Sequence, residues 1–111
     1  MPVNYLIIRA IKSYGAFYGN NLVVECPKGS GHLMNLEQVA VELTRRIVSI
    51  FEKDASGNRR LFGNSNWFYQ QDENKELLLF HEFFHGDNSR GLGASHQTGW
   101  TAVIVDLLQD L

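Results

Sequence analysis

Apolar residues recur at helical spacing in three stretches of the chain, and these stretches predict three helices. The first helix is expected at about residues 3–18, the second at about 36–53 and the third at about 97–110. In the third stretch, Trp100 shares one face with the apolar residues Val103, Ile104, Leu107 and Leu108. No strand pattern competes with these helices, so the spacing favours an all-α fold.

Residues typical of helix ends support the three stretches. Pro2 suits the first turn of the first helix. Asn35 and Gln38 have the spacing of a capping box at the start of the second helix. Ser95 or Thr98 is expected to cap the third helix. Each expected helix therefore begins next to a residue that suits a helix start.

Long glycine-rich connections separate the expected helices. They cover residues 19–34, 54–73 and 86–95 and contain eight of the ten glycines. Compact domains usually use connections of about 4–6 residues, and long ordered loops often carry binding or active sites. The run Leu77–His85 is apolar on every side, and both an extended segment and a buried helical turn fit it. Together these features predict part of a larger helical assembly.

Composition and charge exclude several functions. The chain has 111 residues, 10 Lys+Arg against 12 Asp+Glu and 44% hydrophobic residues, as expected for one globular domain. No basic cluster is larger than Arg45-Arg46 or Arg59-Arg60, so neither nucleic acid nor a membrane is an expected partner. The single Cys26 allows no intrachain disulfide, and neither a signal peptide nor a membrane-spanning apolar run is recognisable. We therefore expect a cytoplasmic location.

Glu82 is the candidate catalytic residue. It lies inside the apolar run Leu77–His85, where a carboxylate is expected to lose hydration and become ready for proton transfer. Hydrogen-bonding residues and the indole of Trp100 follow soon afterwards. Carbohydrates are recognised by such sets, because polar side chains bind hydroxyl groups while an aromatic ring covers an apolar sugar face. The alternative is a buried carboxylate that neighbouring loop N–H groups satisfy.

A zinc site is a second interpretation of the same segment. The pentapeptide His81–His85 matches H-E-x-x-H, which places two imidazoles on one helix face with Glu as general base. A glycine follows the second histidine at once, and Asn88 and Gly91 stand where the extended motif needs a glycine and a third histidine. His96 is a conceivable third ligand, although its spacing does not require that role. We expect no metal and no cofactor.

Three further groups of residues have structural explanations. The aromatic run Trp67–Tyr69 is expected to pin a polar loop to the core. The segment Asp54–Asn58 is expected to form a turn, since it lacks the 12-residue ligand series of a calcium loop. Glu25 is expected to be a solvated loop charge, with the lining of a cleft as its alternative.

The run from His81 to Thr101 closely resembles the C-terminal end of glycoside hydrolase family 63. That family contains the processing α-glucosidase, also called mannosyl-oligosaccharide glucosidase, and hydrolases of glucosylglycerate and mannosylglycerate. Pro2–Arg9, Glu25–Pro27 and Met34–Leu36 agree with the same family, so the resemblance covers essentially the whole chain. Trehalases share a weaker pattern, a Glu-aromatic pair followed by Gly-Trp-Thr.

The resemblance implies an (α/α)6 toroid, which is a double ring of helical hairpins, and an inverting mechanism with two carboxylates. Glu82 matches the position of the general base. His96, Gln97 and Trp100 fall where the family lines its sugar pocket. The Asp general acid of the family lies well upstream of the matching region and has no counterpart in this chain.

We therefore expect residues 1–111 to be a single partial domain, an all-α C-terminal helical-hairpin segment of such a toroid. The expected partners are a carbohydrate, namely an α-glucoside or similar glycoside, and the missing N-terminal part of the toroid. Because one of the two carboxylates is absent, the isolated chain is expected to be inactive. Two alternatives stay open: a non-catalytic carbohydrate-binding or interaction remnant that uses Trp100, and a zinc hydrolase.

Overall fold

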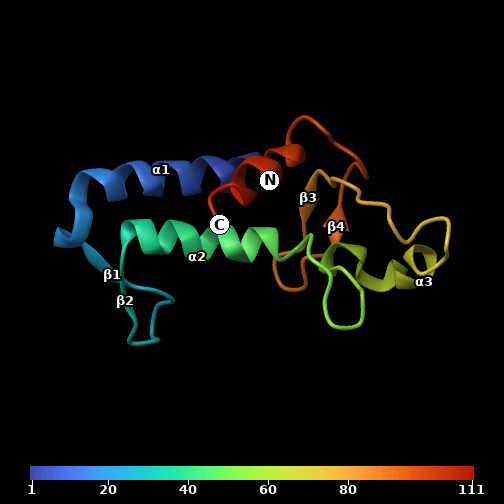
Figure 1. Cartoon of the computed structure of the whole chain (residues 1–111), viewed down its shortest axis with the longest axis horizontal. Helices are drawn as coiled ribbons and strands as arrows, with labels where there is room; N and C mark the ends of the chain where they lie inside the picture. Colours follow the sequence, from blue (N-terminus) through green and yellow to red (C-terminus); the bar gives the residue numbers. More distant parts are fainter.

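An antiparallel pair of long helices is the main feature of the fold. The computed structural model describes the backbone of residues 1–111 and the side chains of residues 1–63 and 67–111. Helix α1 (Pro2–Tyr18) runs beside α2 (Leu36–Val48) in the opposite direction (Figure 1). The molecule measures 51 × 29 × 22 Å, with the helix pair along the longest dimension.

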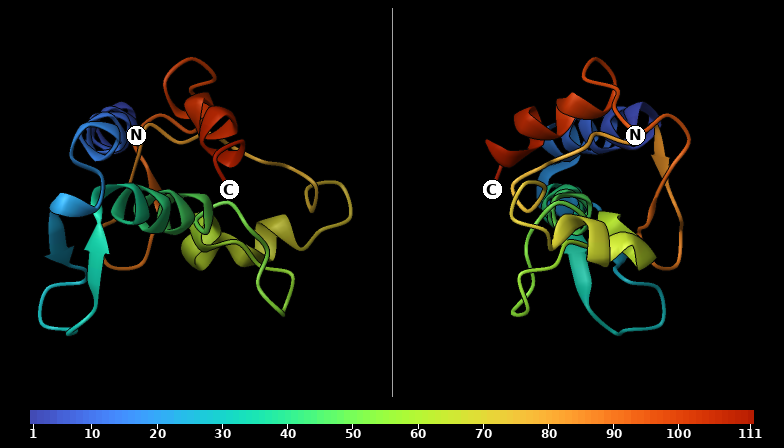
Figure 2. Two further views of the ribbon diagram at one scale, coloured as in Figure 1. Left: turned by 60° about the vertical axis from the view of Figure 1, so that its left-hand side comes forward. Right: turned by 90° about the vertical axis from the view of Figure 1, so that its right-hand side faces the viewer.

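A short third helical segment packs against this pair near both chain termini. It consists of the 3-10 helix η3 (Thr101–Val103) and α4 (Ile104–Leu108), which contacts α2 (Figure 2). The first two predicted helices are thus present. The third prediction of about 97–110 is correct for residues 101–108: residues 97–100 precede the helical segment, residues 109–110 follow it, and neither Ser95 nor Thr98 caps it.

Polar side chains join α1 to α4. Asp106 accepts hydrogen bonds from Arg9 and from the Tyr5 hydroxyl, the latter at 2.7 Å between the oxygens. Asp110 pairs with Lys12 at 2.8 Å and with Arg9 at 3.1 Å. The bond from Tyr5, followed by the bond from Arg9, lowers the pKa of Asp106. Both charged residues of α1 therefore pair with the C-terminal segment: Arg9 with Asp106 of α4 and with Asp110, and Lys12 with Asp110, which follows α4.

Four short strands make the fold mixed α/β, so the prediction of an all-α toroid segment is wrong. β1 (Val23–Glu25) pairs antiparallel with β2 (Leu33–Asn35), and β3 (Phe83–Phe84) pairs antiparallel with β4 (Gly91–Leu92). A strand of two or three residues is shorter than the four to eight residues over which alternation becomes visible in a sequence. β1, β2 and β4 therefore lie where the pattern predicted loops, whereas β3 lies in the run Leu77–His85, for which an extended segment was one of the two predictions.

Turn geometry closes the β1–β2 hairpin. Gly29 and Gly31 have φ values of +84° and +76°, which glycine adopts without the cost that a side chain would bring. The Glu25 carboxylate accepts a hydrogen bond from the Gly31 N–H at 2.6 Å. Hydrogen bonds from the Gly29 and Gly31 backbones lower the pKa of Glu25. Glu25 is exposed, as expected, and it is also a part of its turn.

The start of α2 confirms the predicted capping box. The Asn35 side chain accepts from the Gln38 N–H at 2.9 Å, and the Gln38 side chain accepts from the Asn35 N–H at 3.0 Å. The helix ends at Val48 rather than near residue 53. It ends early because the next residues bond to the loop beyond it: the Ile50 carbonyl accepts from the Leu61 N–H at 3.3 Å.

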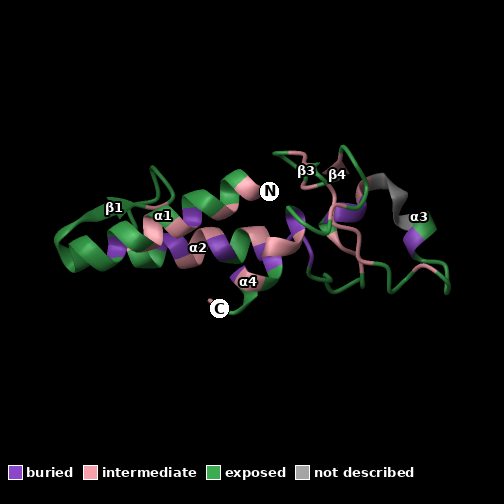
Figure 3. Ribbon diagram, turned by 90° about the horizontal axis from the view of Figure 1, so that it is seen from above, coloured by how far each residue is buried: buried purple, intermediate pink, exposed green. Residues whose placement is uncertain are grey.

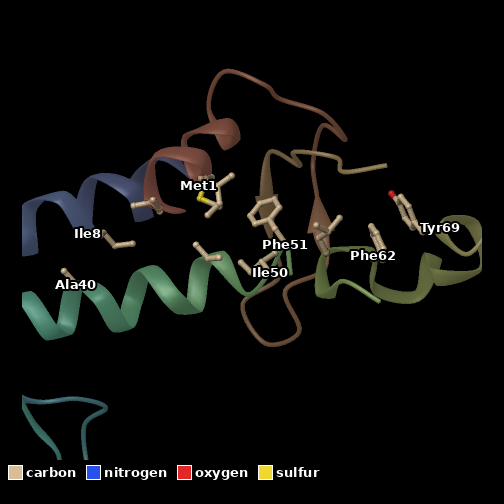
Figure 4. Close-up of a cluster of buried hydrophobic side chains, with 11 residues drawn as sticks. Met1, Ile8, Ala40, Ile50, Phe51, Phe62 and Tyr69 are labelled. Atoms are coloured by element: carbon tan, nitrogen blue, oxygen red, sulfur yellow. The ribbon is translucent and has the colours of Figure 1, made fainter. Parts of the chain in front are cut away.

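One hydrophobic core links the helices to the rest of the chain (Figure 4). Phe51 lies where α2 gives way to the loop, and its ring meets Phe84 of β3 edge-on at a centroid distance of 5.5 Å. The segment formed by η2 (Arg60–Ser65) and α3 (Asn66–Tyr69) follows the loop. Buried residues from all these elements form the cluster: Met1, Ile8, Ala40, Val48, Ile50, Phe51, Leu61, Phe62, Tyr69, Ile104 and Leu107.

The aromatic run Trp67–Tyr69 pins its segment to the core through one residue. Tyr69 is buried and stacks on Phe62 at a centroid distance of 3.9 Å. Trp67 and Phe68 are exposed. The predicted role in the core therefore belongs to Tyr69.

The outer face of α1 is apolar and exposed (Figure 3). Phe17 is 80% exposed, and the charged residues of this helix face α4 instead. The face follows the 3.6-residue period and consists of Val3, Leu6, Ile7, Tyr14 and Phe17. An apolar surface of this kind is typical of an interface.

Candidate functional site

The segment that contains Glu82 is not helical: it bends at Glu82 and continues into the strand β3, so the buried helical turn that its sequence also allowed is absent. β3 pairs with β4 through Phe83 opposite Leu92 and Phe84 opposite Gly91. Beyond the strands the two segments remain bonded, because the Gln97 N–H donates to the Phe80 carbonyl at 2.6 Å. The region from Phe80 to Gln97 is therefore an irregular hairpin that presents the predicted site residues.

Two hydrogen bonds fix Glu82 to the opposite side of this hairpin. Its N–H donates to the Ala94 carbonyl at 2.9 Å, and its carboxylate Oε2 accepts from the Ala94 N–H at 3.0 Å. Gly93 lies under the carboxylate with φ +70°, and a Cβ there would come within 2.6 Å of Glu82 Oε2. A glycine at position 93 therefore allows this close approach.

Glu82 is exposed, so the expectation of a carboxylate desolvated by aromatic neighbours is wrong. The pairing of the hairpin is the physical reason: the carboxylate binds the Ala94 N–H instead of packing among apolar side chains, and its neighbour Phe83 is itself 49% exposed. Leu78–His81, Phe84 and His85 are half-buried. The alternative of a loop N–H satisfying this carboxylate is correct as far as the Ala94 bond is concerned.

The other predicted residues lie along the returning half of the hairpin. His96 stacks on Phe80 at a centroid distance of 5.6 Å, and its Nδ1 accepts from the Phe80 N–H at 3.2 Å. Trp100 is 64% exposed and therefore does not share the buried face of Ile104 as the helical pattern predicted. Glu82, His96 and Trp100 are thus all exposed to solvent on one irregular hairpin and its continuation.

His81 holds the inner side of the hairpin. Its carbonyl accepts from the buried hydroxyl of Thr101 at 2.5 Å, and its ring lies so close to Gly91 that a Cβ there would overlap it. Burial lowers the pKa of His81, and the charge of His96 lowers it further. The ring nitrogen Nε2 is buried and has no hydrogen-bond partner among the described residues.

The zinc interpretation of His81–His85 does not fit this geometry. The pentapeptide is extended and includes β3, whereas a zinc-binding H-E-x-x-H needs both imidazoles on one helix face. His85 Nδ1 accepts from the Asp87 N–H at 3.2 Å. Across residues 1–63 and 67–111, no three His, Cys, Asp or Glu side chains come together in a group able to hold a metal.

Glu82 lines neither of two clefts that the described residues form. One cleft, of about 680 Å³, lies beside β2 and the first turns of α2 and is lined by residues such as Leu33 and Arg45. Another, about 290 Å³, is lined by Arg59, Arg60 and Arg90. Sequence reasoning missed this second cleft, although the pair Arg59-Arg60 was visible, because Arg90 comes from a distant part of the chain.

Comparison with known proteins gives one informative match. The chain is 40% identical over 112 residues to the uncharacterized protein YMR196W of Saccharomyces cerevisiae. The match covers 99% of this chain and 10% of the yeast protein, so the chain spans about a tenth of the length of that relative. No family model and no solved structure matches the chain. The yeast relative shows that a segment like this one exists within a far longer polypeptide.

No helix in the described part of the chain is both long enough and apolar enough to cross a membrane.

Proposed function

We propose that this chain is part of a glycoside hydrolase in which Glu82 acts as the general base. The observation that supports the proposal most directly is the hold on Glu82: the Ala94 backbone binds both its N–H and its carboxylate, while the side chain stays exposed. A general base has to be oriented and has to reach water. A carboxylate that is fixed at its backbone and exposed to solvent meets both needs.

The substrate class in this proposal is an α-glucoside or a similar glycoside. It rests on the resemblance of the run from His81 to Thr101 to family 63 and on the exposed aromatic ring of Trp100. An exposed indole covers the apolar face of a sugar ring, and amide and imidazole groups bind its hydroxyls. In the proposal, Gln97 and His96 supply these polar contacts.

The isolated chain is inactive under this proposal. Inverting hydrolysis needs a second carboxylic acid about 6.5–9.5 Å from the base, with the substrate between the two groups. Glu82 lines neither of the two clefts described above, so further protein has to enclose the sugar and supply the acid. A cytoplasmic location belongs to the same proposal, because Cys26 is a free thiol.

The test is hydrolysis of α-glucosides and of mannosylglycerate by the chain alone and by the chain co-expressed with the product of the adjoining upstream reading frame. We expect hydrolysis in the second preparation only. Glu82→Gln should lower it at least about 100-fold, since general base catalysis contributes about 10²–10⁴-fold. Glu76→Gln is the matched control, because Glu76 is an exposed glutamate that pairs with Lys53 at 3.4 Å away from the hairpin. No hydrolysis after co-expression, or equal rates in both variants, would overturn the proposal.

A second candidate is a non-catalytic carbohydrate-binding module, favoured by the exposure of Trp100. Calorimetric titration of the intact chain with α-glucosides tests which tryptophan binds the sugar. Trp100→Ala should abolish the heat of binding, while Trp67→Ala should leave it unchanged. Trp67 is a suitable control because it is 67% exposed, close to the 64% of Trp100. Absence of heat with the wild-type chain would eliminate this candidate.

A further inference from the structure

The cleft lined by arginines is a second candidate site, separate from the Glu82 hairpin. It has a volume of about 290 Å³ and is lined by residues of the loop that follows α2, of η2 and of the turn that joins β3 to β4. Arg59 comes from the loop, Arg60 begins η2, and Arg90 comes from the turn. Three guanidinium groups from distant parts of the sequence therefore line one small cleft.

These arginines differ from most other basic residues of the chain because no carboxylate neutralises them. Six of the ten Lys and Arg residues form ion pairs: Arg9, Lys12, Arg45, Arg46, Lys53 and Lys75. Arg59, Arg60 and Arg90 have no carboxylate within 4.0 Å among the described side chains. Three of the four basic residues that lack an ion pair therefore line the same cleft.

Asp54 is the one acidic residue that lines the cleft, and its carboxylate is hydrogen-bonded to backbone N–H groups of its own turn. Its Oδ1 accepts from the Ser56 N–H at 2.8 Å and from the Asn58 N–H at 3.0 Å. These bonds confirm the predicted turn at Asp54–Asn58. Three arginines face a single carboxylate, so the lining has an excess of positive charge.

The structure holds two of the arginines in position without using their full hydrogen-bonding capacity. Arg59 Nε donates to the Phe51 carbonyl at 2.7 Å, and its guanidinium lies 5.8 Å from the centroid of the Phe62 ring. Its Nη1 is buried and has no partner among the described residues. The methylene groups of Arg90 pack on Gly63, where a Cβ would overlap them. Preorganised guanidinium groups lose less entropy when they bind an anion.

Asn88 adds a neutral donor to the cleft. Its side-chain oxygen accepts from the Arg90 N–H at 3.0 Å, which fixes the amide and leaves its NH₂ group as a donor. The lining therefore combines guanidinium forks with an amide donor. Such a donor set matches the oxygens of a phosphate group, which carries about −1.5 to −2 charge at neutral pH.

We propose that this cleft binds the phosphate group of a small molecule, either inorganic phosphate or a phosphate monoester. The excess positive charge matches a dianion better than a monoanionic carboxylate. The volume of about 290 Å³ admits a small phosphorylated molecule. The residues that line this phosphate site have no role in the proposed hydrolase function.

The test is calorimetric titration of the intact chain at low ionic strength with inorganic phosphate, with glucose 6-phosphate, and with acetate and glucose as comparators. Both phosphates should bind, acetate should bind at least about tenfold more weakly, and glucose should not bind. Tighter binding of glucose 6-phosphate would identify a phosphorylated sugar as the ligand, and equal binding would identify the phosphate group alone. No binding of either phosphate at millimolar concentration would overturn the proposal.

Variants distinguish this cleft from general attraction to positive charge. Arg60→Gln and Arg90→Gln should each weaken phosphate binding by about 10- to 150-fold, which is the fold-change expected for the loss of one hydrogen bond to a charged group. Arg46→Gln is the control, because Arg46 pairs with Glu42 on α2 at 2.8 Å. An equal loss in the control would refute a specific site. Circular dichroism confirms that each variant is folded, and Arg59 is left intact because it also supports Phe51.

The outcomes separate this proposal from the hydrolase proposal. Glu82→Gln should leave phosphate binding unchanged, because Glu82 does not line the cleft. Arg60→Gln should leave the general base intact. Loss of phosphate binding in the arginine variants with unchanged glycoside hydrolysis would support two independent sites, and loss of phosphate binding in Glu82→Gln would contradict them.

Discussion

Replacement of Gly15 by alanine tests how closely the two long helices approach. Gly15 is buried in α1 opposite the first turn of α2. A Cβ at this position would lie 2.9 Å from the backbone nitrogen of Glu37 and 3.3 Å from the carbonyl carbon of Leu36. Both contacts are with backbone, so no side-chain rotation relieves them, and the helices have to move apart.

Two effects of opposite sign act on Gly15→Ala. Within a helix, alanine is more favourable than glycine by about 1 kcal/mol. Overpacking of a closely packed interface costs about 1–3 kcal/mol. We therefore expect the free energy of unfolding to fall, by up to about 2 kcal/mol. Without the close approach, it should rise by about 1 kcal/mol instead.

Urea unfolding followed by circular dichroism at 222 nm measures this difference. Ala16→Gly is the matched control, because Ala16 is the next residue of the same helix and is exposed. It should lower the free energy of unfolding by about 1 kcal/mol through helix propensity alone. A variant Gly15→Ala that is more stable than the wild type would refute the interhelical contact and with it the packing of α1 on α2.

Three further predictions follow from other contacts. Thr101→Val should destabilise the chain by about 1–3 kcal/mol, because it leaves the His81 carbonyl without its buried donor; an unchanged urea midpoint would argue against that bond. Stability should fall as the pH drops below about 4, because the pKa of Asp106 is lowered in the folded chain from an ordinary value of 3.8. The stabilisation is therefore present above that value and lost as the folded group takes up a proton. Asp106→Asn should weaken this part of the acid transition, and an identical pH profile would contradict the role of the bonds from Tyr5 and Arg9. Phe17→Lys should reduce self-association measured by sedimentation, since Phe17 is 80% exposed on the apolar face of α1; unchanged sedimentation would show that this face does not drive association.

Features that depend on neighbours in the chain could be predicted from the sequence. The capping box of Asn35 and Gln38 joins residues three positions apart, and the structure has both of its hydrogen bonds. The turn at Asp54–Asn58 is equally local. α1 and the start of α2 follow from the 3.6-residue period for the same reason.

Features that depend on distant partners were missed or misjudged. The pairing of β3 with β4 was missed, because two-residue strands leave no pattern. β3 lies in the run Leu77–His85, for which an extended segment was one alternative, and β4 lies in an expected loop. Glu82 was expected to be desolvated by its apolar sequence neighbours, but the distant Ala94 N–H binds its carboxylate and the side chain stays exposed. The spacing of Trp100 predicted that it shares the apolar face of a helix, but the helical segment begins one residue later, at Thr101.

The sequence by itself determined where the two long helices begin and which residues form their apolar faces, because helix formation depends on residues three or four positions apart. The tertiary structure alone decided that the fold is mixed α/β, that Glu82 is exposed beside Ala94, and that Arg90 joins Arg59 and Arg60 in one cleft. Such pairings require the closure of loops between distant segments, and the free energy of that closure comes from the packing of the whole core rather than from any local pattern.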